Sequence, residues 1–293
     1  MLIPRPRNIT NKYVKNILNL RQHLYLDVYL VNYCNLNCKW CSRWCNVVKH
    51  RQIYKTEDII RDSLRVLDTD SNIHFFGFNG GEPLLHPDID ELLKFLVDCK
   101  KKYKLDRIHI QTNGKKLLSM SDEFFRLARE GNLKVSYTKY PKASKVDYDE
   151  VVKRLKDEHI DYYNFAGDTI GLEQDSYVKY FDVTKYRLND HSKDNQLQCY
   201  YVCLKISLAL WHGKLFKCCD LPFIETLNDT FDAGFKLVEG DDYFEVNKLD
   251  KDFDLMKWKN TPSSFCKVYC PNRELYSEEW SIGKNTKEDL LVT

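Results

Sequence analysis

The sequence predicts an α/β fold built on a parallel sheet, and two observations carry that prediction. Short apolar runs rich in β-branched and aromatic residues alternate with amphipathic stretches of helical period along residues 24–183. Repeated strand–helix units of this kind are joined by right-handed crossovers between parallel strands. The stretches of unusual composition fall where the expected strands end, which is the edge at which such folds build active sites.

The expected elements follow in order after a leading helix at residues 8–22. The strands are expected at residues 24–33, 73–78, 107–111, 133–138, 162–165 and, as a sixth, 178–183. The helices between them are expected at residues 56–67, 88–103, 121–130 and 147–158, with Leu92, Leu93, Leu96 and Cys99 on the buried face of the second. Residues 205–210 and 214–217 are expected to form a β-hairpin around Trp211-His212-Gly213.

Composition and charge narrow the class of protein. The chain has 293 residues, of which 43% are hydrophobic and 30% charged, an ordinary balance for a soluble globular protein. A net charge of +2 indicates neither a nucleic acid nor a membrane partner. Residues 1–7 lack the apolar run of a signal peptide and no segment is long enough to span a bilayer, so we expect a cytoplasmic protein.

The 11 cysteines are clustered. Four lie between residues 34 and 45, six lie between residues 199 and 270, and Cys99 stands alone. In a reducing compartment, clustered cysteines favour metal or redox chemistry over structural disulfides. The sequence therefore predicts two metal-binding regions.

The first region is the stretch Cys34-Asn35-Leu36-Asn37-Cys38-Lys39-Trp40-Cys41, directly after the first expected strand. Three thiolates at this spacing can ligate three irons of a [4Fe–4S] cluster and leave the fourth iron open for chemistry. Zinc with Cys45 as a fourth ligand is the alternative, as are disulfides if the chain is secreted.

Two further turns end the second and third expected strands. Gly80-Gly81-Glu82-Pro83 offers a strand edge free of side chains, where backbone carbonyls can approach a ligand and Glu82 adds an anionic acceptor. Thr112-Asn113-Gly114 follows the next strand. Each stretch, taken alone, is more typical of a simple strand-ending turn, and Asn-Gly in particular is a common turn pair.

Together, the spacing Cys-x3-Cys-x-aromatic-Cys and these two turns resemble the radical S-adenosylmethionine (SAM) superfamily over residues 24–185. The resemblance implies a partial (β/α)6 TIM-like barrel and a [4Fe–4S] cluster held by Cys34, Cys38, Cys41 and SAM. It implies that the run from Gly80 to Pro83 holds the SAM amino group and that Thr112 and Asn113 line the site, while Trp40 is a candidate to contact the adenine. Ser136 is assigned to the SAM carboxylate or ribose, although Ser136-Tyr137-Thr138-Lys139 departs from the family's Ser-x-Asp-Gly.

The second cysteine region resembles the auxiliary-cluster domain of radical SAM enzymes, of the SPASM or twitch type, through Cys-x9-Gly-x4-Cys and a later cysteine pair. The resemblance implies a second [4Fe–4S] cluster held by Cys203, Cys218, Cys266 and Cys270, with Cys199 and Cys219 as alternates. A four-cysteine zinc staple on the same hairpin is the competing interpretation. The expected division is an extension at residues 1–23, a radical SAM core at 24–190, and a small hairpin-and-helix iron–sulfur domain at 191–293.

The expected function follows from both resemblances. Reductive cleavage of SAM gives a 5′-deoxyadenosyl radical that abstracts hydrogen from a small polar substrate, such as a sugar or aminocyclitol, and the second cluster accepts the electron of a two-electron oxidation. The electron donor is expected to be a protein such as flavodoxin or ferredoxin. The alternatives are a redox-neutral epimerase, with Cys45 as the candidate hydrogen donor, a peptide-modifying enzyme, and a metal- or redox-sensing protein without catalysis.

Overall fold

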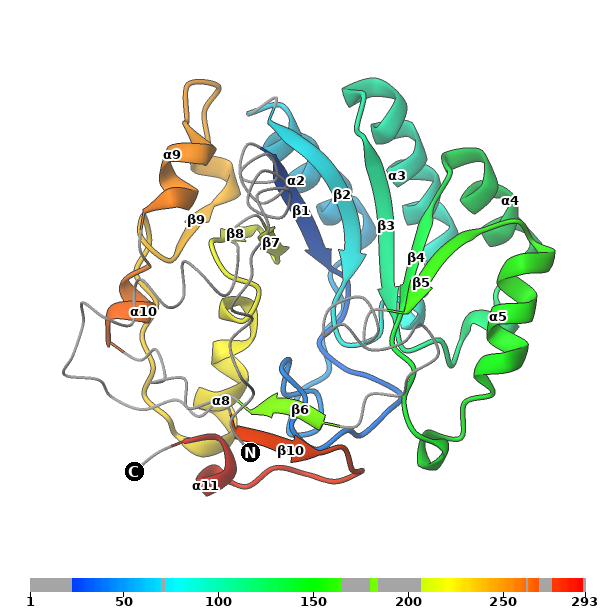
Figure 1. The fold of residues 1–293 in the computed structure, drawn as a ribbon. Coiled ribbons are helices and arrows are strands. Elements are labelled where there is room, and N and C mark those ends of the chain that lie inside the picture. The colour runs from blue at the N-terminus through cyan, green and yellow to red at the C-terminus, as the bar shows by residue number, and fades with distance from the viewer. Residues whose placement is uncertain are drawn as a thin grey trace, which may run out of the picture.

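A mostly parallel sheet forms the centre of the molecule. This computed structural model describes residues 23–69, 72–164, 180–183, 207–261, 263–268 and 276–291. Its large sheet has the strand order β5-β4-β3-β2-β1-β7-β8-β9 (Figure 1). The strands are β1 (Leu24–Tyr29), β2 (Ile73–Asn79), β3 (Arg107–Thr112), β4 (Lys134–Tyr137), β5 (Asp161–Asn164), β7 (Ser207–Trp211), β8 (Lys214–Phe216) and β9 (Tyr243–Glu245).

The strands from β5 to β7 in this order pair in parallel, whereas β8 and β9 pair antiparallel. The predicted α/β class and parallel sheet are confirmed. The predicted leading helix at residues 8–22 lies outside the described residues. The predicted domain boundary after residue 190 stays a prediction, because residues 184–206 lie outside them as well.

Helices connect the parallel strands and bury one stripe each. They are α2 (Thr56–Leu67), α3 (Ile89–Tyr103), α4 (Asp122–Gly131) and α5 (Tyr148–Asp157). In α3 the predicted inner residues Leu92, Leu93, Leu96 and Cys99 are all buried. Three lysines occupy its last turn, where they complement the negative end of the helix dipole.

The predicted sixth strand is present, but its expected place in the parallel sheet is wrong. The strand at this position, β6 (Tyr180–Val183), pairs antiparallel with β10 (Tyr276–Glu279) in a separate two-stranded sheet. The strand that lies beside β1 is instead β7, the first strand of the predicted hairpin, with Asp27 opposite Ala209. The hairpin of β7 and β8 is confirmed, and it extends the large sheet.

The remaining helices follow the hairpin. They are α8 (Ile224–Phe231), α9 (Leu255–Asn260), α10 (Ser264–Val268) and α11 (Lys287–Leu290). Side chains of the hairpin, including Leu208, Leu210 and Leu215, belong to the same buried cluster as those of β1 and β2. Within the described part of the chain, no helix combines the length and the hydropathy that crossing a bilayer requires.

Candidate active site

Three cysteine thiols border one cavity at the carboxyl ends of the parallel strands. Cys34, Cys38 and Cys41 lie in the loop that leaves β1, and all of them line a cavity of about 120 Å³. The ends of β2 and β3 supply much of the remaining wall: Asn79, Gly80, Gly81, Gln111, Thr112 and Asn113. The structure therefore brings the cysteines and both predicted turns together at one edge of the sheet.

The glycine turn is held against the chain that leads into the cysteine loop. The Gly81 N–H donates to the Val31 carbonyl at 2.8 Å, and the Glu82 N–H donates to the Tyr33 carbonyl at 3.0 Å. A β-carbon on Gly81 would lie 2.1 Å from the Tyr33 oxygen, so only glycine allows this approach. Gly81 is thus required by the backbone of the cysteine loop in addition to its place on the cavity wall.

The Glu82 carboxylate is fully buried and binds protein donors. It accepts hydrogen bonds from Thr112 Oγ1 at 2.7 Å, from the Asn113 N–H at 2.8 Å and from the Leu84 N–H at 3.2 Å. Burial raises the Glu82 pKa to about 7, and these hydrogen bonds limit the rise. Glu82 therefore ties the end of β2 to the end of β3, and in this structure it is a positioning residue; its predicted contact with SAM stays a prediction.

A pH-dependent stability is expected from this buried acid. Because the folded-state pKa of Glu82 lies above the ordinary 4.5, folding retains a proton that the unfolded chain releases, and the unfolding free energy falls as pH rises between these values. Between about pH 5 and about pH 8, we expect the unfolding free energy of the wild type to fall by roughly 2 kcal/mol more than that of Glu82→Gln. Denaturant unfolding of the reduced protein across this range measures it. Glu57→Gln, on the exposed start of α2, is the control, and parallel profiles for wild type and Glu82→Gln would contradict the assignment.

The other predicted cofactor residues differ in where they lie. Asn113 lines the cavity, and its amide donates to Cys34 Sγ at 3.3 Å and to Asn35 Oδ1 at 2.7 Å. Pro83 is buried and opens a short 3-10 turn. Ser136 lies in β4 and is buried, and its hydroxyl has no hydrogen-bond partner among the residues described. Neither Pro83 nor Ser136 lines the cavity.

Trp40 is positioned by a segment from the far end of the chain. It is half-buried with φ of 66°, and its N–H donates to Asn285 Oδ1 at 3.0 Å. It is absent from the cavity wall, so its predicted contact with adenine stays a prediction.

Residues 280–285, here called the C-terminal strap, pair with the cysteine loop. Cys38 and Ile282 form an antiparallel bridge, flanked by hydrogen bonds from the Lys39 N–H to the Ser281 carbonyl and from the Gly283 N–H to the Asn37 carbonyl, each 2.8 Å long. Trp280 is buried in a small cluster with Leu36 and Cys38, against Cys34, Cys41 and Tyr140. Sequence reasoning missed this strap, because nothing in its composition marks it.

The Trp280 indole N–H is buried in the cluster that contains Cys38 and makes no hydrogen bond among the described residues, so it is a candidate donor to a sulfur of this loop. Burial raises the Cys38 pKa to about 12, and the Trp280 N–H opposes that rise. A donor of this kind stabilises the more negative, reduced state of an iron–sulfur cluster. We expect Trp280→Phe, which keeps an aromatic ring but removes the N–H, to lower the reduction potential of a cluster on this loop without loss of iron.

A redox titration followed by electron paramagnetic resonance (EPR) measures that shift. Trp258→Phe is the matched control, because its indole donates to the Gly240 carbonyl at 2.7 Å and does not serve the cysteine loop. Equal potentials for wild type and Trp280→Phe would show that the N–H does not act on the cluster.

The fourth cysteine of the loop differs from the other three. The Cys45 thiol donates to the Arg43 carbonyl at 3.9 Å, and its interaction with Cys41 lowers the Cys41 pKa, whereas burial raises the pKa of Cys34 and Cys38. Cys45 is not on the cavity wall. Three sulfurs on one cavity, with N–H donors from Leu36 and Asn113 aimed at Cys34, suit a cluster that has three protein ligands and one open iron.

The second cysteine region is described only in part. Cys199, Cys203 and Cys270 lie outside the described residues, as does the side chain of Cys266, so the predicted four-ligand set stays a prediction. The ligand atoms of Cys218, Cys219 and Asp220, which follow β8, lie within 4.8 Å of one another.

Two contacts connect this second region to the cysteine loop. Arg43, which lines the cavity, forms an ion pair with Asp220 at 2.8 Å, and the Tyr29 hydroxyl donates to the Cys219 carbonyl at 3.1 Å. The Arg43 guanidinium also lies over the Tyr29 ring, 5.3 Å from its centroid. The two cysteine regions are therefore joined by a half-buried ion pair and a buried aromatic side chain.

A polar pair occupies the sheet face that carries Gln111. His109 precedes Gln111 by two residues in β3, and alternate residues of a strand share a face. His109 Nε2 lies 3.0 Å from Asp27 Oδ1 of β1, across the intervening strand β2, and the pair is nearly buried. Burial raises the pKa of Asp27, but hydrogen bonds from His109 and Ser207 and the charges of His109 and Arg43 outweigh it, so the pKa is lowered.

Gly77 of β2 is what allows this pair. A β-carbon at Gly77 would lie between 2.3 and 2.5 Å from three atoms of the His109 ring. The imidazole therefore crosses β2 directly over a glycine. An isolated glycine inside a strand is a signal of such a close approach. The sequence Phe75-Phe76-Gly77-Phe78 contains this signal, which could have indicated the pair.

Comparison with known proteins identifies the class. Residues 28–190 match the radical SAM superfamily. The chain belongs to this superfamily, and membership implies a [4Fe–4S] cluster and SAM as its cofactors.

Individual relatives match shorter parts. "Molybdenum cofactor biosynthesis protein 1" of Dictyostelium discoideum is 33% identical over 122 residues, which are 41% of this chain and 18% of the relative. "GTP 3′,8-cyclase" of Chlorobaculum tepidum is 32% identical over 91 residues, 31% of this chain and 26% of the relative. The chain thus spans about a quarter or less of each of these two relatives.

Solved structures also resemble this chain. "Native anSMEcpe with bound AdoMet" has a TM-score of 0.47 and 14% identity, covering 84% of this chain and 89% of that one. "Crystal structure of BtrN in complex with AdoMet and 2-DOIA" has a TM-score of 0.39 and 18% identity, covering 50% of this chain and 58% of that one.

Proposed function

We propose that this protein cleaves SAM reductively and uses the 5′-deoxyadenosyl radical to abstract hydrogen from a small polar substrate. The observation that carries the proposal is the cavity at the strand ends, on which three cysteine thiols, the glycine edge and Asn113 converge. A bound cluster supplies the electron that breaks the sulfonium of SAM. Glu82 and Gly81 fix the walls of that cavity, and the C-terminal strap covers the loop that holds the cluster.

The polarity of the face below the cavity supports a polar substrate. Gln111 lines the cavity, and the Asp27–His109 pair lies on the same face one pleat further down the strands. Asp27 and His109 satisfy each other, but an apolar substrate would leave the remaining acceptors of this face, such as the buried His109 Nδ1, unpaired at a cost of a few kcal/mol. A hydroxylated substrate, such as a sugar or an aminocyclitol, can satisfy them.

His109 has the arrangement of a general base for a substrate hydroxyl. An ionised Asp27 can only accept a hydrogen bond, so His109 Nε2 carries a proton, and Nδ1 is an open acceptor whenever the ring carries no second proton. His109 Nδ1 is buried and has no partner within the described chain. In the proposed two-electron oxidation, the C–H hydrogen leaves as an atom to the radical, the O–H proton goes to His109 Nδ1, and the remaining electron goes to a second [4Fe–4S] cluster.

The contacts of Arg43 and Tyr29 support the second cluster as electron acceptor. They join the cysteine loop to Asp220 and Cys219, beside the proposed ligand Cys218. We propose Cys203, Cys218, Cys266 and Cys270 as its ligands, with Cys199 and Cys219 as alternates. Cys45 contacts Cys41 and is absent from the cavity wall, which weakens the alternative of an epimerase that uses Cys45 as hydrogen donor.

Cyclisation of a nucleoside triphosphate is a second candidate. It is favoured by the relatives named GTP 3′,8-cyclase, which are about 30% identical over about a third of this chain. A nucleotide is also hydroxylated, so the Asp27–His109 pair is compatible with either substrate class.

Anaerobic reconstitution tests the proposal. Two clusters predict an iron content near eight atoms per chain. An iron content near four atoms together with bound zinc would mean that the second site holds zinc and cannot accept the electron. With dithionite, or with flavodoxin or ferredoxin as proposed cytoplasmic donors, SAM should yield 5′-deoxyadenosine. A panel of sugars, aminocyclitols, GTP and a short peptide should show which class stimulates that yield. Absence of 5′-deoxyadenosine from cluster-loaded protein with every donor would overturn the proposal.

A further inference from the structure

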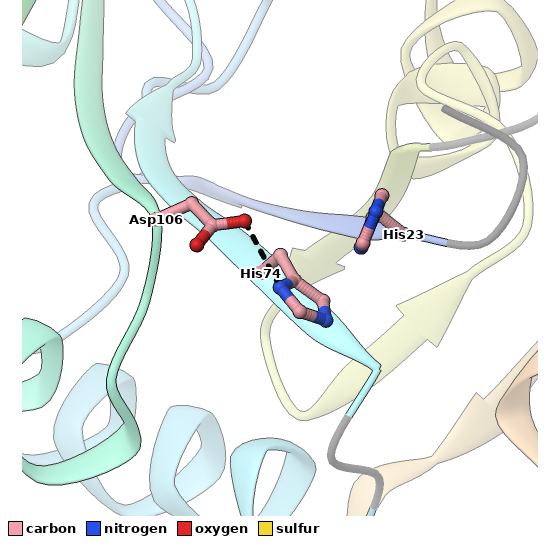
Figure 2. Close-up of side chains that lie close together, drawn as sticks. All are labelled: His23, His74 and Asp106. Atoms are coloured by element: carbon pink, nitrogen blue, oxygen red, sulfur yellow. Dashed lines mark hydrogen bonds and ion pairs between the residues drawn. The ribbon is translucent and has the colours of Figure 1, made fainter. Parts of the chain in front are cut away.

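Three potential metal ligands meet at the end of the sheet away from the cavity. His23 directly precedes β1, His74 is the second residue of β2, and Asp106 directly precedes β3. Because these strands are parallel, their amino ends share the edge opposite to the one that carries Cys34. Figure 2 shows the His74 ring between His23 and Asp106.

The backbone holds these residues in place. The Leu24 N–H donates to the Asn72 carbonyl at 2.8 Å, and the Asp106 N–H donates to the His74 carbonyl at 2.9 Å. Both bonds lie within one residue of the side chains concerned. The three side chains therefore project from a rigid edge of the sheet, which suits a preorganised site.

The side-chain geometry is close to that of a coordination shell. One ligand atom from each residue lies within 4.8 Å of the other two. His74 Nδ1 and Asp106 Oδ2 are 3.0 Å apart, and the rings of His23 and His74 have centroids 4.1 Å apart at an interplanar angle of 76°. Two ligands at about 2.1 Å from a tetrahedral zinc lie roughly 3.4 Å from each other, so small side-chain rotations would close the shell.

His23 supplies the independent indication of a ligand. Its Nδ1 atom is buried and has no hydrogen-bond partner in the part of the chain that the structure describes. A hydrogen bond between His74 and Asp106 explains those two residues but leaves this buried nitrogen unexplained. A cation shared by all three would satisfy it.

We propose that His23, His74 and Asp106 bind a divalent transition-metal ion of the zinc class. Two imidazole nitrogens and one carboxylate oxygen are the donors such ions prefer, whereas calcium and magnesium require more oxygen ligands. Asp106 is 58% exposed, which gives the ion a path from solvent and leaves room for a water as the fourth ligand. The bound ion would fix the start of β1 to β2 and β3, and it is separate from the cysteine cavity.

Zinc binding to the cluster-loaded protein tests this proposal. After removal of adventitious metal, calorimetry with Zn²⁺ and metal analysis should show one zinc per chain beyond the iron, with a Kd below about 10 µM. His74→Gln and Asp106→Asn should weaken binding at least 10- to 100-fold. His50→Gln, an exposed histidine elsewhere, is the matched control and should bind as the wild type does.

A second measurement distinguishes zinc bound at this site from zinc bound by cysteine thiolates. Co²⁺ at the proposed site should give a tetrahedral visible spectrum without the sulfur charge-transfer band that a thiolate ligand produces. Comparable thermal melting of apo wild type and His74→Gln would show that the variant folds. A Kd above about 10 µM for wild type, equal binding by His74→Gln, or a thiolate band would each overturn the proposal.

Discussion

Replacing Cys34, Cys38 or Cys41 by alanine is expected to abolish SAM cleavage. These three thiols border one cavity, and each is a proposed ligand to a different iron, so no neighbouring residue can substitute for a lost sulfur without moving the loop. Loss of a supporting contact around a metal centre typically costs 10- to 100-fold, and loss of a ligand should cost more. We expect 5′-deoxyadenosine formation to fall below about 1% of the wild-type rate in each variant. Chromatography of single-turnover mixtures measures it.

The control for these variants lies in the same loop. Cys45→Ala removes a fourth thiol that contacts Cys41 but does not line the cavity, so it should retain the cluster and at least about a third of the activity. Iron analysis and EPR should show the loss of one cluster in the Cys34, Cys38 and Cys41 variants only. If Cys45→Ala loses iron to the same extent, the ligand set contains four cysteines and the open-iron interpretation fails.

The parts of the site that could be predicted from the sequence are those whose residues lie close together along the chain. The cysteine spacing and the Gly80–Pro83 turn each lie within a few residues, and the strand–helix alternation predicts the edge on which they meet. The structure places the three cysteines and the two glycines of this turn together on one cavity. Local pattern is sufficient where both the residues and their geometry are local.

Contacts between distant segments could not be predicted in this way. The C-terminal strap reaches the cysteine loop through a bridge from Ile282 to Cys38, and no periodicity in either segment specifies that pairing. The wrong sheet assignment of the sixth strand has the same cause. Its apolar run fits a strand, but the choice of partner, β10 instead of the parallel sheet, depends on tertiary packing.

Glu82 has a role in the structure that its motif did not indicate. An acid beside a glycine turn suggested an acceptor for the SAM ammonium, which stays a prediction, and the structure also uses both carboxylate oxygens to join two strand ends. Which donors a buried acid meets depends on Thr112 and Asn113, thirty residues away in the chain. A motif identifies the residue type, and the partners of that residue decide what it does.

Gly77→Ala is expected to have the largest effect of any substitution that adds only one methyl group to this sheet. The new β-carbon would overlap the His109 ring, which would have to leave Asp27. Breaking a buried pair leaves an uncompensated charge, so we expect the unfolding free energy to fall by about 3–5 kcal/mol. Substrate-stimulated 5′-deoxyadenosine formation should fall as well, while cluster content, which depends on the other end of the strands, should be retained.

A double-mutant cycle with His109→Ala separates this cause from general damage to β2. His109→Ala alone removes the Asp27 partner and should cost a similar 3–5 kcal/mol. Once the ring is gone, the methyl group of Gly77→Ala meets no side chain from His109, so the double variant should be less stable than His109→Ala by under about 1 kcal/mol. Denaturant unfolding of the four proteins measures the coupling. Additive losses in the double variant would mean that Gly77 is required for another reason, and that the His109–Asp27 pair does not depend on the space that this glycine leaves above β2.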